Sequence, residues 1–207
     1  MNGQHFGDWG LSMKQLLRLA LLWLCLAPTA ASAHVAIGDT SDFMHGLIHP
    51  LGGLDHQLAM ILVGIFAYQL GERALWLVPL TFVSVMAFGG FLGVMGVAIP
   101  FVEVGIALSV IMLGAVIAFR VKTPVAGAMA FLGLFAIVHG HAHGSEMSMD
   151  ASGVEYGIGF MLAAGFLHAI GIGIGVVIGM SGKTLGDNMY RLAGGLASIA
   201  GVACLLG

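Results

Sequence analysis

Apolar segments of about twenty residues follow one another along most of this chain. Of its 207 residues, 59% are hydrophobic and only 8% are charged, whereas a soluble globular domain carries about 25% charged residues. Each apolar segment is long enough to cross the hydrocarbon core of a bilayer as an α-helix. We therefore expect an all-α integral membrane protein surrounded by lipid. The net charge of −3 gives no reason to expect a nucleic-acid partner.

Residues 1–33 have the pattern of a secretory signal peptide. Basic residues precede a short apolar core, and an Ala-Ser-Ala sequence that ends at Ala33 matches the preferred cleavage site. A start at Met13 would give a more compact leader. We expect cleavage after Ala33, which leaves residues 34–207 as a single transmembrane domain.

We expect a bundle of six transmembrane helices in the mature chain, joined by short connections that make neighbouring helices antiparallel. The predicted spans are residues 50–70, 75–96, 100–119, 124–143, 155–180 and 189–206. The basic residues of the mature chain lie at the connections after the first, third and fifth spans, and they are Arg73, Arg120, Lys122, Lys183 and Arg191. The positive-inside rule makes these connections cytoplasmic. In a bacterial cell this predicts a multi-pass inner-membrane protein with a periplasmic N-terminus, which agrees with a cleaved leader.

Glycines at intervals of four residues indicate that some of these helices pack closely. Gly89 and Gly93 lie in the second predicted span, and Gly171, Gly175 and Gly179 lie in the fifth. Small residues at this spacing line one face of a helix and let a neighbouring backbone approach.

Histidines and acidic residues gather in the outer half of this predicted bundle. The candidate metal ligands are His49, Asp55 and His56 in the first span, Glu103 in the third, His139, His143 and Glu146 in the fourth, and His168 in the fifth. His45, His141 and Glu155 are candidate entrance groups around them. An ionisable residue at the bilayer centre costs about 2.5–3.5 kcal/mol on insertion scales, so such groups must face partners, water or an ion. An acidic, histidine-rich entrance also attracts cations.

The spacing in the first span predicts a shared helix face. His49 and His56 are seven residues apart and would lie on the same side of an ideal helix, with Asp55 rotated by about 100° from His56. Pro50 lies between the two histidines and can distort the first turn.

The spacing in the fourth span predicts a second ligand face. His139 and His143 are four residues apart, and Glu146 continues the same face one turn later. His141 points in another direction. Imidazole nitrogens combined with carboxylate oxygens suit Ni²⁺, Co²⁺, Zn²⁺ and Cu²⁺, and they suit Mg²⁺ or Ca²⁺ poorly.

Structural roles compete with this interpretation at single positions. A lone histidine in an apolar helix, such as His168, is more often a packed residue than a ligand. Glu103 alone could be an acid that the helix dipole favours near a helix N-terminus. The coincidence of ligand-type residues in two different spans favours a metal site over these separate structural roles.

Two motifs resemble those of the HupE/UreJ family. The run His49–His56 (HPLGGLDH) looks like the family's HPxxGxDH signature, and His139–Glu146 (HGHAHGSE) is similar to its second histidine-rich motif. The resemblance covers essentially the whole mature chain. It implies a nickel permease that serves the maturation of nickel-iron hydrogenase or urease, with cobalt as the alternative ion. It also implies functional roles for His49, Asp55, His56, Glu103, His143 and Glu146, and for Phe82 as a pore-lining ring.

The expected function is therefore transport of a divalent transition-metal ion, Ni²⁺ before Co²⁺, with Zn²⁺ also compatible with the ligands. We expect no enzymatic activity and no prosthetic group. The chain carries no nucleotide-binding motif, so a secondary transporter, driven by an ion gradient, the membrane potential or a separate partner, is the expected class. Hydrogenase or urease maturation proteins are the expected functional partners, and a homo-oligomer is compatible with the sequence.

Three other functions use the same residue types. An intramembrane hydrolase would hold Zn²⁺ with His and Asp and activate water. A b-type cytochrome would use two transmembrane histidines as haem ligands. A membrane metal sensor or chaperone would bind the ion without moving it across the bilayer.

Overall fold

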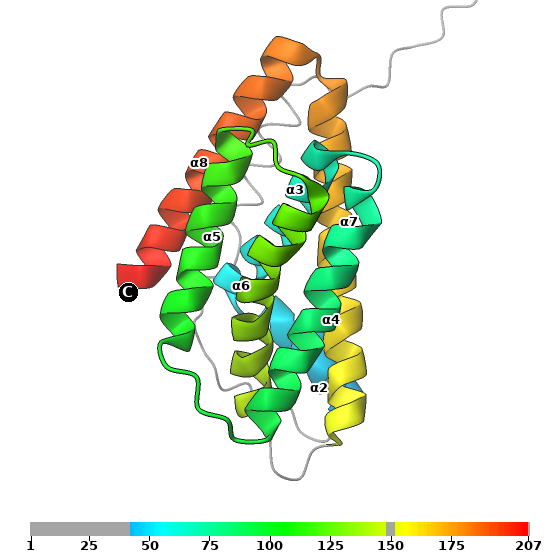
Figure 1. The fold of residues 1–207 in the computed structure, drawn as a ribbon, viewed down its shortest axis with the longest axis vertical. Coiled ribbons are helices and arrows are strands. Elements are labelled where there is room, and N and C mark those ends of the chain that lie inside the picture. Colours follow the sequence, from blue (N-terminus) through cyan, green and yellow to red (C-terminus); the bar gives the residue numbers. More distant parts are fainter. Residues whose placement is uncertain (1–41, 148–151, 207) are drawn as a thin grey trace, which may run out of the picture. The chain divides into compact units, whose positions relative to one another are not determined.

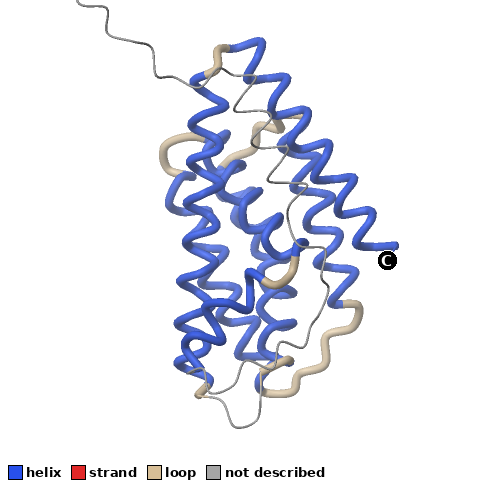
Figure 2. The backbone as a smooth tube through the Cα atoms, turned by 180° about the vertical axis from the view of Figure 1, so that it is seen from behind, coloured by secondary structure: helices blue, strands red, loops and turns tan. Residues whose placement is uncertain are grey.

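A computed structural model describes residues 42–147 and 152–206 (Figure 1). The described chain is helical and contains no strand, as the composition predicts. Its elements are α2 (Asp42–Ile48), the 3₁₀-helix η1 (His49–Leu51), α3 (Leu54–Leu70), α4 (Ala74–Val94), α5 (Val102–Ala118), α6 (Val125–Ser145), α7 (Gly153–Met180) and α8 (Lys183–Leu206). The predicted signal peptide lies outside these residues. Figure 2 shows the same helices from behind, with short loops between them.

Helix length and composition identify a multi-pass membrane protein. Within the described ranges, α4, α6, α7 and α8 are each long and apolar enough to cross a bilayer. The pair formed by α2–η1 and α3 would be a fifth crossing, broken by a bend of 81°. α5 is apolar but has only 17 residues.

The bend changes one prediction about the first span. α3 begins at Leu54, four residues later than predicted, because Pro50 lies in a 3₁₀ turn and Gly53 has an extended backbone (φ −104°, ψ 125°). His49 and His56 are therefore on opposite sides of a break, and the prediction that they share the face of one continuous helix is wrong. The break still leaves both residues at the same end of the bundle.

α3 is the central helix of the bundle. It contacts each of α4, α5, α6, α7 and α8, and every residue from Leu62 to Ala67 is buried. A helix that is apolar around its whole circumference must be enclosed by neighbours or by lipid. Here protein encloses it, so its histidine-bearing N-terminus is fixed relative to all the other long helices.

Glycines bring the backbones of neighbouring helices into contact, as their spacing predicts. A Cβ atom at Gly171 of α7 would overlap the Ile61 carbonyl of α3, and one at Gly89 of α4 would overlap the Ile137 carbonyl of α6. Gly93 lies against the backbone of α6 at His141 in the same way. These contacts define two tight pairs, α3 with α7 and α4 with α6.

We expect Gly171→Ala to lower the melting temperature of the purified protein, because the added methyl group meets the fixed backbone of α3. Overpacking of this kind costs about 1–3 kcal/mol. Gly173→Ala is the matched control on the same helix, since its Cβ atom would have no neighbour within 4 Å. Alanine is also the better helix former by about 1 kcal/mol, so this control should keep or raise the melting temperature. Equal melting temperatures for the two variants would contradict the α3–α7 contact.

Candidate metal centre

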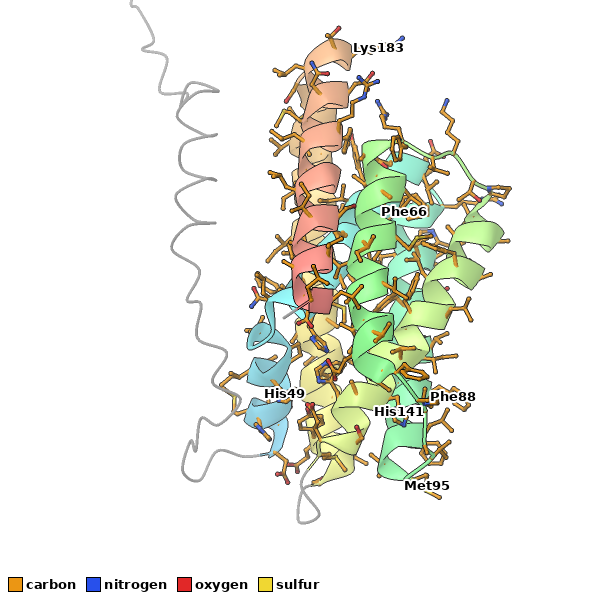
Figure 3. The ribbon with its side chains drawn as sticks, turned by 90° about the vertical axis from the view of Figure 1, so that its left-hand side faces the viewer. His49, Phe66, Phe88, Met95, His141 and Lys183 are labelled. Carbon is orange, nitrogen blue, oxygen red and sulfur yellow. The ribbon has the colours of Figure 1, made fainter. Side chains whose placement is uncertain are left out.

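Ligand candidates from three helices meet at one end of the bundle. Figure 3 shows His49 and His141 towards this end and Lys183 at the opposite one. Short α2 is pressed against α7 because Gly46 and Gly159 leave no room for a Cβ atom between the two backbones. This packing places the histidines of α2 and η1 beside α6 and α7.

The outermost group consists of His49, His143 and Glu146. One ring nitrogen of each histidine and one carboxylate oxygen lie within 4.8 Å of one another. The Nε2 atom of His49 is 3.1 Å from Oε2 of Glu146. A metal with ligand bonds of about 2.1 Å keeps its neighbouring ligand atoms roughly 3–4 Å apart. Small side-chain movements would therefore let one ion bind all three groups.

This outer group opens to water on one side. The Glu146 side chain is 55% exposed and that of His49 is 27% exposed, whereas His143 is only 4% exposed. The hydrogen bond from the His49 ring holds the pKa of the Glu146 carboxyl below its usual value, against the effect of partial burial. Glu146 is thus an ionised hydrogen-bond acceptor on the exposed side of this group, and His143 is its buried member.

Asp55 and His56 form a pair at the start of α3. Oδ1 of Asp55 accepts hydrogen bonds from the backbone N–H and from Nδ1 of His56, both at 2.8 Å. A carboxylate only accepts, so Nδ1 carries the proton and Nε2 keeps a lone pair. Histidine ligands of metals are commonly oriented by a carboxylate in this way. Asp55 therefore positions His56, and a Cβ atom at Gly53 would lie only 2.9 Å from Oδ1 of Asp55 and 3.0 Å from Nδ1 of His56.

His139 is oriented by the backbone of its own helix. Its Nδ1 atom lies 2.9 Å from the carbonyl oxygen of Phe135, so Nδ1 donates and Nε2 carries the lone pair. The ring is fully buried, and its Nε2 has no hydrogen-bond partner among the described residues. His56 Nε2 is likewise buried without a partner there. The His56 and His139 ring centroids are 5.3 Å apart, so two neighbouring imidazoles each have a free lone pair.

His143 connects the outer group with this inner pair. Its ring centroid lies 4.9 Å from that of His49 and 4.4 Å from that of His56. Both ring nitrogens of His143 are buried without a partner among the described residues. His143 can therefore present a nitrogen to an ion at either position.

Phe82 and His168 lie deepest in this row of rings. The Phe82 ring centroid is 5.8 Å from that of His139 and 5.4 Å from that of His168. Phe82 is fully buried, and His168 is 1% exposed. Neither ring nitrogen of His168 has a partner in the described chain. The Phe82 ring thus contacts His139 of the cluster on one side and His168 on the other.

Three residues singled out from the sequence lie apart from the cluster. His141 is buried, and its Nε2 is 2.6 Å from the carbonyl oxygen of Val97, so it ties α6 to the α4–α5 connection. Glu103 and Glu155 are exposed in the first turns of α5 and α7. Within the described ranges, neither acid forms a hydrogen bond or an ion pair with a histidine. His45, also exposed, does reach the cluster, since its ring centroid lies 5.6 Å from that of His49.

Tyr156 of α7 belongs to the site but was not singled out from the sequence. Its ring centroid is 5.9 Å from that of His49, and it stacks on Phe160 at 6.3 Å. The side chain is 5% exposed, and its hydroxyl has no partner among the described residues. Tyr156 and Phe160 are one turn apart on α7, but the contact of Tyr156 with His49 joins α7 to η1, so spacing along α7 could not have revealed it.

Comparison with known proteins agrees with the two motifs. The profile of the family described as HupE / UreJ protein matches residues 22–204. The chain is 45% identical over 180 residues to Protein HupE of Rhizobium leguminosarum bv. viciae, a match that covers 87% of this chain and 92% of that protein. No solved structure matches the chain. The family match and the relative together show that this chain belongs to the HupE/UreJ family.

Proposed function

We propose that this protein transports a divalent transition-metal ion, Ni²⁺ first and Co²⁺ second, across a bacterial inner membrane. The observation that carries the proposal is the row of imidazoles that begins at the exposed Glu146–His49 pair and ends at buried His168. A purely structural role would leave few buried ring nitrogens without partners, because an unpaired buried polar group is costly. Ions that move along the row would use those lone pairs.

The ligand chemistry supports a borderline metal as the substrate. The outer group offers two imidazoles and one carboxylate, and the inner pair offers two imidazole Nε2 atoms. Nitrogen-rich sites of this kind suit Ni²⁺, Co²⁺ and Zn²⁺ better than Mg²⁺ or Ca²⁺. The preference for nickel rests on the family and on its link to hydrogenase and urease maturation.

The path has two positions in this proposal. The ion first binds His49, His143 and Glu146, where water has access. His143 then transfers it to His56 and His139, whose lone pairs are set by Asp55 and by the Phe135 carbonyl. The Phe82 ring contacts both His139 and His168, so in this proposal the ring must move before the ion can pass from His139 to His168.

The proposed topology has six spans, α3 to α8, with the histidine cluster on the periplasmic side. Four of the described helices are long and apolar enough to cross a membrane by themselves. α3 joins them as part of the bent pair, and short α5 joins them because it packs along α8 and against central α3. Arg73, Arg120 and Lys183 lie at the α3–α4, α5–α6 and α7–α8 connections, which supports a cytoplasmic location for that end. A cleaved signal peptide completes this topology.

We expect purified protein in proteoliposomes to take up Ni²⁺ and to lose this uptake in His49→Ala, Glu146→Gln and Asp55→Asn. The first two changes remove a ligand from the outer group. The third leaves His56 without its orienting carboxylate, and the loss of such a partner lowers metal affinity or activity about 10–100-fold. Uptake would be measured with radioactive or fluorescent metal indicators, with Co²⁺ and Zn²⁺ as competitors.

Glu72→Gln is the control for this series. Glu72 is an exposed acid in the α3–α4 connection, and the whole length of α3 separates it from Asp55 and His56. This variant should take up Ni²⁺ at the wild-type rate. A folded wild type that binds Ni²⁺ without any flux would reject transport and favour a metal sensor. Bound Zn²⁺ with hydrolytic turnover would favour an enzyme.

His139→Gln should separate binding from transport. The outer group is intact in this variant, so the Kd for Ni²⁺ should stay close to the wild-type value, whereas uptake should fall about tenfold or more because the inner position loses a ligand. Binding would be followed by calorimetry and flux in proteoliposomes.

His141→Gln is the matched control, a buried histidine two residues away whose nitrogen bonds the Val97 carbonyl instead of facing the cluster. It should retain both binding and flux per folded molecule. Wild-type flux in His139→Gln would remove His139 from the path, and parallel losses of binding and flux would assign it to the first position.

A further inference from the structure

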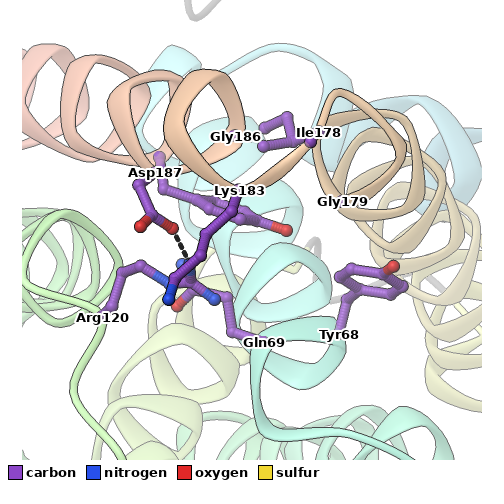
Figure 4. A pocket seen from close by; sticks show the side chains of 10 residues that line it. Tyr68, Gln69, Arg120, Ile178, Gly179, Lys183, Gly186 and Asp187 are labelled. Atoms are coloured by element: carbon purple, nitrogen blue, oxygen red, sulfur yellow. Dashed lines mark hydrogen bonds and ion pairs between the residues drawn. The ribbon is translucent and has the colours of Figure 1, made fainter.

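Basic side chains surround two adjoining pockets at the end of the bundle opposite the histidines. The first pocket has a volume of about 380 Å³, and Arg120, Lys183 and Asp187 are among its lining residues. The second has a volume of about 430 Å³ and lies between Arg120 and Arg191. Arg120 lines both pockets. Figure 4 shows Arg120, in the turn after α5, and Lys183 of α8 at the first one.

The two arginines differ in how they are paired. The Arg120 guanidinium forms an ion pair with Asp187 and lies 5.1 Å from the ring centroid of Tyr190. Arg191 is exposed and has no hydrogen bond or ion pair within the described residues. Three cationic side chains and one carboxylate line the two pockets, so the site keeps an excess of positive charge.

The second pocket is lined by apolar residues beside its two arginines. Ala118, Phe119 and Gly195 complete its lining, and Phe119 is 81% exposed. Further along α8, after Arg191, the side chains of Leu196 and Ile199 are exposed. A guanidinium beside exposed apolar side chains of a membrane helix matches a molecule with a phosphate at one end and a hydrocarbon chain at the other.

We propose that Arg191 and Arg120 bind the phosphodiester headgroup of an anionic phospholipid, with an acyl chain over the exposed apolar surface of α8 at Leu196 and Ile199. Planar guanidinium groups bind phosphate oxygens through paired, charge-assisted hydrogen bonds. The Arg120–Asp187 pair holds one of the two arginines in place. The bound lipid would join α5 to the first half of α8 at the membrane surface, independently of any ion in the histidine cluster.

Membrane topology alone does not require this arrangement. The positive-inside rule needs basic residues on the cytoplasmic side, and exposed Arg73 in the α3–α4 connection satisfies that need without lining either pocket. Arg191 of α8 and Arg120, which follows the end of α5, are instead far apart in the sequence and share one pocket.

The test is native mass spectrometry of the full chain with phosphatidylglycerol or phosphatidylcholine of identical acyl chains. We expect phosphatidylglycerol to be retained in preference and to raise the melting temperature, since a ligand that binds only the folded state stabilises it. Arg191→Gln should weaken phosphatidylglycerol binding about fivefold, as the loss of one basic contact at a membrane surface predicts.

Arg73→Gln is the matched control and should bind phosphatidylglycerol like the wild type. Arg191→Lys keeps the charge and the aliphatic stem but loses the paired hydrogen bonds of a guanidinium, so its binding should fall between that of Arg191→Gln and that of the wild type. It tests the charge even if Arg191→Gln folds poorly. Equal retention of phosphatidylcholine, or equal losses in Arg73→Gln and Arg191→Gln, would overturn the proposal. Competition by free glycerol phosphate as strong as by the lipid would replace it with a soluble-phosphate site.

Discussion

Direct backbone contact between helices determines where the histidines of this protein lie. Gly140, between His139 and His141, leaves α6 in contact with the carbonyl of Met86 on α4, and Gly144 packs against Gly90 in the same way. On the other side, Gly64 of α3 lies against the carbonyl of His168 on α7. Side chains as large as leucine at these contacts would separate the helices by several ångströms. The ring-to-ring distances of 4.4–5.8 Å between His143, His56, His139 and Phe82 depend on this close packing.

The same close packing buries histidine nitrogens that have no hydrogen-bond partner among the described residues. Nitrogens of His56, His139, His143 and His168 are buried without partners in the described chain, and each unpaired buried group costs about 1–3 kcal/mol. Asp55 and the Phe135 carbonyl do not reduce this cost, because they bind the other nitrogen of each ring. They determine which nitrogen remains free. A fold optimised only for stability would have leucine or phenylalanine here, so the free lone pairs support the ion binding that we propose.

Much of the fold follows from the sequence, because apolar run length and glycine spacing act locally along each helix. The prediction for α6 also depends on local spacing: His139 and His143 are one turn apart, and both rings contact His56. The arrangement of His49 and His56 could not be predicted from helix periodicity, because Pro50 and Gly53 end one helix and start another. The partners of His141 and the contacts of Tyr156 with the cluster are tertiary. Such contacts join residues of different segments, so no spacing rule within one segment can predict them.

The two ends of the bundle carry opposite kinds of charge, and this difference bears on the direction of the transport that we propose. Ligand groups and an ionised carboxylate lie at the histidine end, whereas Arg120, Arg191 and Lys183 lie at the other end, partly balanced by Asp187. A cation is attracted to the first end and repelled by the second, and an exit must bind the ion weakly enough to let it leave. A phosphate group held by the arginines would reduce that repulsion. The lipid composition around the exit would then influence the rate of release without contacting the ion.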